Sequence, residues 1–224
     1  RLDFVHSGGA TNYSETAGTL TVGEHDSTVS ASRAGEGYAS TLTFASLART
    51  GHGTVDFAGE ALGEAGGTRN RILFATPPAL VNGFIGPWAT VNGTALAMYD
   101  TTRGVYAAPD SAYTNIAARG PDSVIPDNAA LNVHISTDGT SGPISLEGEG
   151  GAGIYTLTQL TDITATVATA GKTLSTCAVT IDDDAGALTL GENIGDGTLQ
   201  IASGVNELTL ENRSTNAMTI NATI

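Results

Sequence analysis

The sequence predicts an all-β protein, and within that class it favours a β-solenoid over a β-sandwich. The first observation is composition: 29 of the 224 residues are Gly, 40% are hydrophobic and only 14% are charged. Such a chain is too hydrophobic for a disordered tail, and its Thr, Val and Ile residues suit pleated strands. The second observation is a series of short segments that alternate apolar and polar residues, and the third is the even spacing of these segments.

The C-terminal third shows the alternation most clearly. Five triplets each place two apolar residues on one face and a polar residue on the other, at 179–181, 188–190, 199–201, 208–210 and 218–220. The connectors between them are nearly equal in length, and they are too short to hold a helical crossover. Taken two at a time, the triplets recur about every 20 residues, which predicts stacked coils with two strands each. An antiparallel meander or β-sandwich remains the alternative, although three-residue strands are short for one.

The same alternation continues upstream and sets the expected domain organisation. It recurs at 20–22, 42–44, 55–57, 131–135, 144–146 and 163–167. We therefore expect solenoid coils over 1–71 and 130–224, as parts of one continuous solenoid. The block 72–129 breaks the rhythm, because it contains several prolines and the only tryptophan, Trp88. Proline cannot donate to a strand ladder, so we interpret 72–129 as an irregular insertion packed on the solenoid by its aromatic residues.

That block also carries a resemblance to a known family. Residues 81–94 read VNGFIGPWATVNGT and are followed by Tyr99 and Asp100. This segment is similar to one that recurs in autotransporter-associated β-strand repeat proteins, which are very large surface proteins of planctomycetes, verrucomicrobia and related bacteria. Shorter strand-like segments, such as GTLTV at 18–22 and GTLQI at 197–201, extend the likeness over most of the chain. The resemblance implies a right-handed parallel β-helix, exported to the cell surface, and it supplies no catalytic residue.

Charge and hydropathy exclude two classes of partner. The formal net charge is −14. Residues 1–120 hold 10 acidic and 7 basic side chains, whereas 121–224 hold 13 acidic and 2 basic ones, including the only lysine, Lys172. Nucleic-acid binding depends on Lys and Arg contacts to phosphate, so we expect no nucleic-acid partner. We also expect no membrane span in this segment, because no apolar run approaches the roughly 18 residues that a membrane helix needs.

The two ends of the chain suggest a piece of a longer protein. Residues 1–4 do not resemble a natural start, no signal peptide is visible, and residues 218–224 are typical of a strand rather than of a cap. We therefore predict a structural or adhesive segment of a large exported surface protein, located at the cell surface or outside the cell. Its expected partners are neighbouring repeats or other copies stacked end to end, and cell-surface glycans.

Asp182, Asp183 and Asp184 are the strongest candidates for a metal site. They follow the triplet 179–181 at a predicted corner, and Ca²⁺ takes oxygen ligands in flexible geometry. However, the Gly-Gly-x-Gly-x-Asp repeat of calcium-binding β-rolls is absent from the sequence. Charge runs are usually solvated, so we favour a solvated turn and predict no metal ligand here.

Other potentially reactive residues are scattered. The histidines His6, His25, His52 and His134 show no zinc-binding spacing, so we interpret them as surface residues. Cys177 precedes a predicted strand and is interpreted as a core thiol. Four Asn-x-Ser/Thr sequons occur in this Asn- and Thr-rich chain, at Asn12, Asn92, Asn212 and Asn221, and are expected by chance.

A carbohydrate-active β-helix, such as a polysaccharide lyase or a phage tailspike, is the alternative function. Glu147 and Glu149 would share a face if their segment were extended, as a glycosidase pair requires. The neighbouring Gly148, Gly150 and Gly151 instead predict a turn. Because no nucleophile elbow or phosphate-binding loop is present, we predict no catalytic residues and no cofactor. A β-sandwich binding module is a third possibility.

Overall fold

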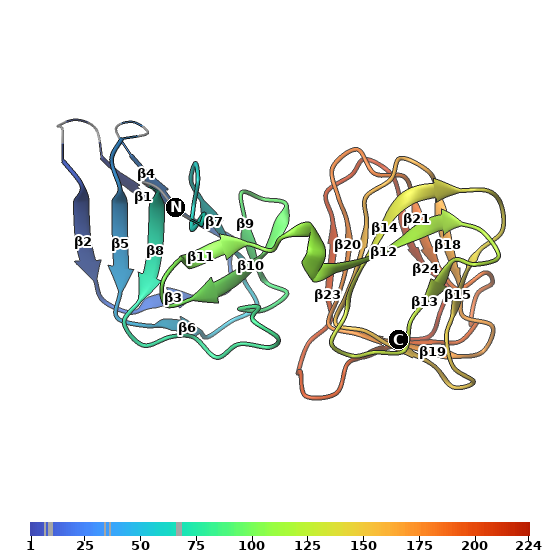
Figure 1. Ribbon diagram of the computed structural model, residues 1–224. Helices are drawn as coiled ribbons and strands as arrows, with labels where there is room; N and C mark the ends of the chain where they lie inside the picture. The colour runs from blue at the N-terminus through green and yellow to red at the C-terminus, as the bar shows by residue number, and fades with distance from the viewer. Residues whose placement is uncertain (7, 9–10, 34, 36, 66–68) are drawn as a thin grey trace. The chain divides into compact units, whose positions relative to one another are not determined.

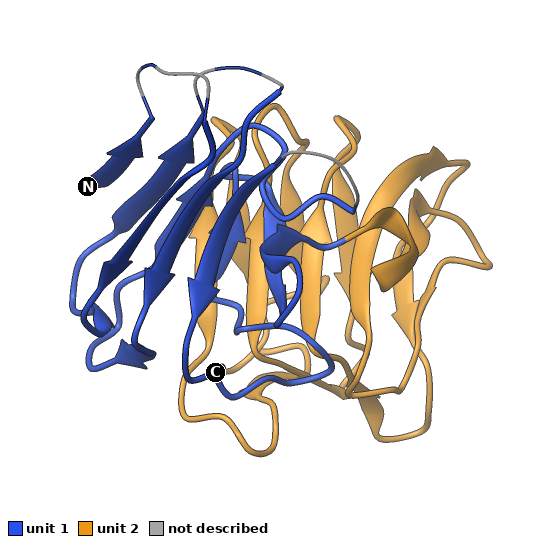
Figure 2. Ribbon diagram, turned by 60° about the vertical axis from the view of Figure 1, so that its left-hand side comes forward, with its two compact units in different colours: residues 1–108 blue, residues 109–224 orange. Residues whose placement is uncertain are grey.

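The computed structural model describes residues 1–224 except 7, 9–10, 34, 36 and 66–68. The described residues contain no α-helix, and most of their strands form stacked parallel sheets (Figure 1). The predicted all-β parallel solenoid is therefore confirmed. Contacts within the chain divide it into two compact units, unit 1 (Arg1–Ala108) and unit 2 (Pro109–Ile224), which are coloured separately in Figure 2.

Unit 1 is built from coils with three strands each. Its strands are β1 (Leu2–Val5), β2 (Tyr13–Ala17), β3 (Leu20–Val22), β4 (Ser27–Ser32), β5 (Ser40–Phe44), β6 (Leu47–Arg49), β7 (Val55–Ala58), β8 (Asn70–Phe74), β9 (Ala89–Val91), β10 (Ala95–Asp100) and β11 (Gly104–Ala107). Parallel ladders join β1-β4-β7-β9, β2-β5-β8 and β3-β6, and Figure 1 shows β2, β5 and β8 side by side. One turn of the chain leads from Leu2 to its ladder partner Val29.

The core of unit 1 lies between its three sheets. The alternation of strands such as β5 and β8 turns every second side chain inward, so that Leu42, Phe44, Ile72 and Phe74 are all buried. Phe44 and Phe74 stack across neighbouring coils with ring centroids 6.0 Å apart. Column-like stacking of this kind is the expected result of parallel, in-register coils.

The last part of unit 1 departs from the parallel pattern. β9 still stacks in parallel on β7, but β10 pairs antiparallel with β9, and β11 pairs antiparallel with β10. The hydroxyl of Tyr99 in β10 accepts the N–H of Phe74 at 3.1 Å and donates to the carbonyl of Phe74 at 3.0 Å. These are backbone groups that a further coil would otherwise pair, so Tyr99 caps the edge of β8.

Unit 2 has the same three-sided construction. It contains the short 3₁₀ turn η1 (Asp110–Ala112) and the strands β12 (Tyr113–Arg119), β13 (Val124–Ile125), β14 (Asn132–Gly139), β15 (Ile144–Leu146), β16 (Gly151–Gly153), β17 (Thr156–Gln159), β18 (Ala165–Ala168), β19 (Thr173–Thr176), β20 (Ala178–Ile181), β21 (Leu188–Leu190), β22 (Thr198–Ile201), β23 (Thr209–Asn212) and β24 (Met218–Ile220). Its sheets are β12-β14-β17-β20-β23, β13-β15-β18-β21-β24 and β16-β19-β22.

The predicted coil of two strands is wrong. The prediction stacks Val179 on Leu199, two triplets further along the chain, whereas Val179 pairs with Leu210. Strands β20, β21 and β22 belong to three different sheets, so one turn of the chain takes three of the predicted triplets. The turn from Thr156 to Ala178 is also much shorter than the next one, from Ala178 to Thr209. Because the triplets are nearly equally spaced along the sequence, any grouping of them gives a regular period. The observed coil contains three strands, and its length varies from one turn to the next.

The predicted boundaries of the insertion also differ from the observed division. Residues 70–74 form β8, a regular strand of unit 1, and the stretch 89–107 contains the closing strands of that unit. Residues 113–125 contain β12 and β13, which begin two sheets of unit 2. Each unit thus has its own sheets and its own buried core. The prolines of the block 72–129 lie in the irregular connections between these strands.

Candidate functional site

The outermost coils expose side chains that elsewhere form the core. In unit 2, Val133, Leu157 and Val179 form one inward-facing column and are fully buried. The next member of this column is Leu210 in β23, which is 42% exposed. The first coil of unit 1 shows the same feature. Leu2, which pairs with the buried Val29, is 45% exposed.

These coils also carry the open edges of the sheets. In the described part of the chain, β1, β23 and β24 each lie at an edge of their sheet. An edge strand presents unpaired backbone N–H and C=O groups, which can pair with another strand. Apolar side chains and open backbone groups therefore occur together in the first coil of unit 1 and in the last coil of unit 2.

Two other sheet edges, at β8 in unit 1 and at β16 in unit 2, are closed by side chains. Tyr99 pairs the backbone of Phe74 in unit 1, as described above. In unit 2, β16 is the first strand of the β16-β19-β22 sheet, and there the N–H of Gly153 donates to Asp127 Oδ1 at 2.8 Å.

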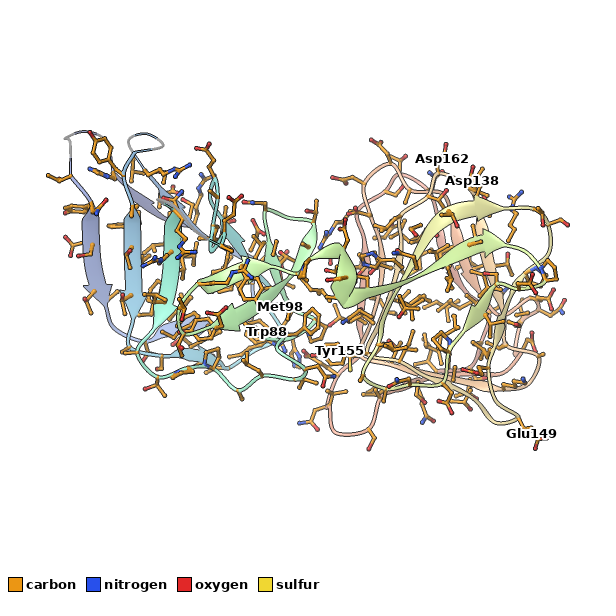
Figure 3. All side chains as sticks on the ribbon, in the orientation of Figure 1. Trp88, Met98, Asp138, Glu149, Tyr155 and Asp162 are labelled. Atoms are coloured by element: carbon orange, nitrogen blue, oxygen red, sulfur yellow. The ribbon has the colours of Figure 1, made fainter. Side chains whose placement is uncertain are left out.

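Glu147 and Glu149, the carboxylates that the carbohydrate-active alternative would use, lie in a turn, as the neighbouring glycines predict. Glu147 Oε2 accepts the N–H of Asp127 at 2.9 Å, so this carboxylate is used to hold the backbone. Glu149 projects from the loop between β15 and β16 (Figure 3) and lines a hollow of about 390 Å³ together with Asp127. Lys172 Nζ donates hydrogen bonds to the carbonyl oxygens of Leu146 and Gly148 in the same turn, at 3.2 and 2.7 Å.

The floor of this hollow depends on glycine. Gly151 has a φ of 124°, and a Cβ at this position would collide with the carbonyl oxygen of Thr173 in the next coil. Gly151 and Gly153 line the hollow with Thr173, Ser175 and Gln200. None of the residues that line it is aromatic, so it lacks the ring surface on which sugars commonly stack.

The aspartate run lies in the turn after β20, where the sequence predicted a corner. Asp182 forms an ion pair with Arg213 at 3.4 Å, and Asp184 has a positive φ of 59°. Among the described residues, no group of three or more His, Cys, Asp or Glu side chains is placed to hold a metal ion. A second carboxylate pair that the sequence did not single out, Asp138 and Asp162, flanks the hydroxyl of Thr161 (Figure 3).

The four histidines have different surroundings. His25 and His52 are exposed in turns, as expected, but His6 is buried and stacks on Tyr13 with ring centroids 5.5 Å apart. His134 stacks on Tyr113 at 3.7 Å, and burial lowers the pKa of its imidazole to about 4. The interpretation of the histidines as surface residues is therefore wrong for His6 and incomplete for His134. Sequence could not reveal the Tyr113–His134 stack, because it depends on the pairing of β12 with β14.

Cys177 and the sequon asparagines have structural roles. Cys177 is buried, as predicted, and burial raises the pKa of its thiol to about 11. The side-chain amides of the sequon asparagines all bond to backbone groups: Asn12 to Ala39, Asn92 to Gly59, Asn212 to Asn216 and Asn221 to Gly191. Such bonds fix corners between strands.

Trp88 lies in an apolar recess of unit 1. Leu47, Pro78, Ala79 and Ile85 line this recess of about 220 Å³. The guanidinium of Arg49 sits 5.0 Å from the centroid of the Trp88 ring. This cation–π contact already occupies the ring, and we assign the recess a packing role.

Comparison of the chain with profiles of known protein families, with curated proteins and with solved structures finds no match. Within the described ranges, no helix has the length and hydrophobicity needed to cross a membrane.

Proposed function

We propose that this chain is a structural segment of a large exported bacterial surface protein, in which stacked coils build a stiff filament. The observation that carries the proposal is the exposure of the core column at the outermost coils, at Leu2 in unit 1 and at Leu210 in unit 2. Full burial of an exposed leucine side chain contributes about 1.5–3 kcal/mol, and Leu2 and Leu210 still expose 45% and 42% of their surface, so each can contribute somewhat less than half of that amount. The occupant that fits is a further coil of the same kind, because it would continue both the apolar column and the backbone ladder.

The two outermost coils are of similar size. One turn of the chain separates Leu2 from Val29 in unit 1, and one turn of nearly the same length separates Leu188 from Met218 in unit 2. A contact between different ends of two copies is heterologous, and such contacts make open filaments when the rotation does not close a ring. Location at the cell surface is supported by the resemblance of residues 81–94 alone.

The test is the length distribution of the purified segment in negative-stain electron microscopy across a range of concentrations. We expect particles that lengthen with concentration. Leu210→Asp places a charge at the end of the column and should leave only single-length particles. Leu80→Asp is the matched control, because Leu80 is 39% exposed but lies outside the strands, and it should assemble like the wild type.

Two results would contradict the proposal. One is a length distribution that does not change with concentration in the wild type. The other is unchanged assembly of Leu210→Asp. The carbohydrate-active alternative has less support, because Glu147 and Asp127 are both engaged in backbone hydrogen bonds and the hollow beside Glu149 lacks aromatic residues.

A further inference from the structure

A second hollow of unit 2 has a different character. It measures about 370 Å³ and is lined by residues of η1, β12 and β14 together with Leu160. The lining residues are Asp110, Tyr113, Asn115, His134, Ser136, Thr137 and Leu160. Its volume lies at the lower end of the range of ligand pockets, about 300–1,000 Å³.

Two stacked rings form a fixed wall of this hollow. Tyr113 and His134 lie with ring centroids 3.7 Å apart and ring planes 22° apart. In β14, Val133 and Ile135 point into the core, so the alternation turns His134 and Ser136 outward. The hollow is therefore on the outer surface of the sheet, and its aromatic wall is held by the pairing of two strands.

The polar groups of the hollow are arranged beside these rings. Asn115 pairs with His134 across the ladder, and Ser136 Oγ donates to Asn115 Oδ1 at 2.9 Å. This bond fixes the amide of Asn115 and leaves its NH₂ group as a donor. Because burial keeps the pKa of His134 at about 4, the imidazole is neutral at neutral pH. Asp110 then supplies the only formal charge among the lining residues.

The single negative charge and the neutral polar groups of this hollow favour a neutral, polar ligand. A phosphate, sulfate or uronate would meet the Asp110 carboxylate and no cation, and unit 2 as a whole is strongly acidic. A purely apolar ligand would leave the Asn, Ser and Thr groups unpaired. A neutral sugar offers a C–H face to an aromatic ring and hydroxyl groups to amide and carboxylate oxygens.

We propose that this hollow binds a neutral saccharide, with the Tyr113–His134 stack as its platform and Asn115, Ser136 and Asp110 as its polar contacts. This inference goes beyond the proposed function, because a purely structural filament needs no saccharide partner. The two are separable by experiment, since the hollow lies on the outer face of a sheet of unit 2 and the open edges lie at the outermost coils.

The experiment titrates the full chain with cellohexaose, mannohexaose, maltohexaose and chitohexaose, by calorimetry and by saturation-transfer NMR. Hexagalacturonate of the same length is the charged probe. We expect saturable binding of at least one neutral oligomer and none of hexagalacturonate. Tyr113→Ala should weaken that binding about tenfold or more, which corresponds to about 1.4 kcal/mol.

Asn115→Ala is the second variant, because Asn115 is exposed and its replacement leaves the core intact. It should also weaken binding, whereas Glu149→Gln in the other hollow should not. Binding of no neutral oligomer, tighter binding of hexagalacturonate, or wild-type affinity in both Tyr113→Ala and Asn115→Ala would overturn the proposal. Tyr113→Ala should still lengthen in electron microscopy, and Leu210→Asp should still bind sugar, so failure of one proposal is distinguishable from failure of the other.

Discussion

At the residue scale, the burial of His134 links the stability of unit 2 to pH. An unfolded histidine has a pKa of about 6.5, whereas the pKa of His134 in the folded protein is lowered to about 4 by burial, with the nearby Asp110 opposing part of that effect. Between these values the unfolded chain binds a proton that the folded chain does not. The free energy of unfolding therefore falls as the pH drops from about 6.5 to about 4.

We expect this one residue to lower the free energy of unfolding by about 1–3 kcal/mol across that window, with partial exposure reducing the effect. Urea unfolding at the two ends of the window would show the loss, and His134→Gln should make the dependence on pH shallower. An NMR titration of the His134 ring tests the cause directly. A titration midpoint near that of an exposed histidine would contradict the prediction.

At the scale of single elements, the capping of β8 by Tyr99 gives a prediction for unit 1. Tyr99→Phe removes the hydroxyl that pairs both backbone groups of Phe74. Leaving buried backbone groups unpaired costs about 1–3 kcal/mol, so unit 1 should unfold at a lower urea concentration. Trp88 fluorescence reports on unit 1. Tyr106→Phe keeps the ring that faces Arg103 at 3.6 Å and should change stability little. Equal stability of the two variants would rule out the capping role.

The sequence could predict the positions of single strands, but it could not predict which strands pair. Strands such as β3 and β21 were located by alternation, because the inward and outward directions of side chains are set locally. Their partners were not, because the corners differ in length and β20 pairs with β23 rather than with the strand two triplets further on. The Tyr113–His134 hollow was missed for the same reason. It forms only when β12 and β14 pair, with a register shift after Ile116.

For the whole molecule, the separate cores of the two units predict two unfolding transitions. One buried cluster contains only residues of unit 1 and the other only residues of unit 2, and stability in solenoids is a sum over neighbouring coils. The chain offers one probe for each unit: Trp88 in unit 1, and Cys177 in unit 2, whose buried thiol reacts only after unfolding. We expect the fluorescence and thiol-labelling midpoints in urea to differ. If the two midpoints coincide in the wild type and still coincide in Tyr99→Phe, the two units unfold together as one cooperative unit.

The three-sided coil has a consequence for how far such a protein can reach. Each turn of the chain advances the stack by only about 4.8 Å. Pulled straight, even the shorter turn from Thr156 to Ala178 would span about 70 Å. A projection of about 1,000 Å would thus need roughly 200 turns and about 5,000 residues. An organism can meet that demand by translating one giant polypeptide or by joining many smaller ones end to end.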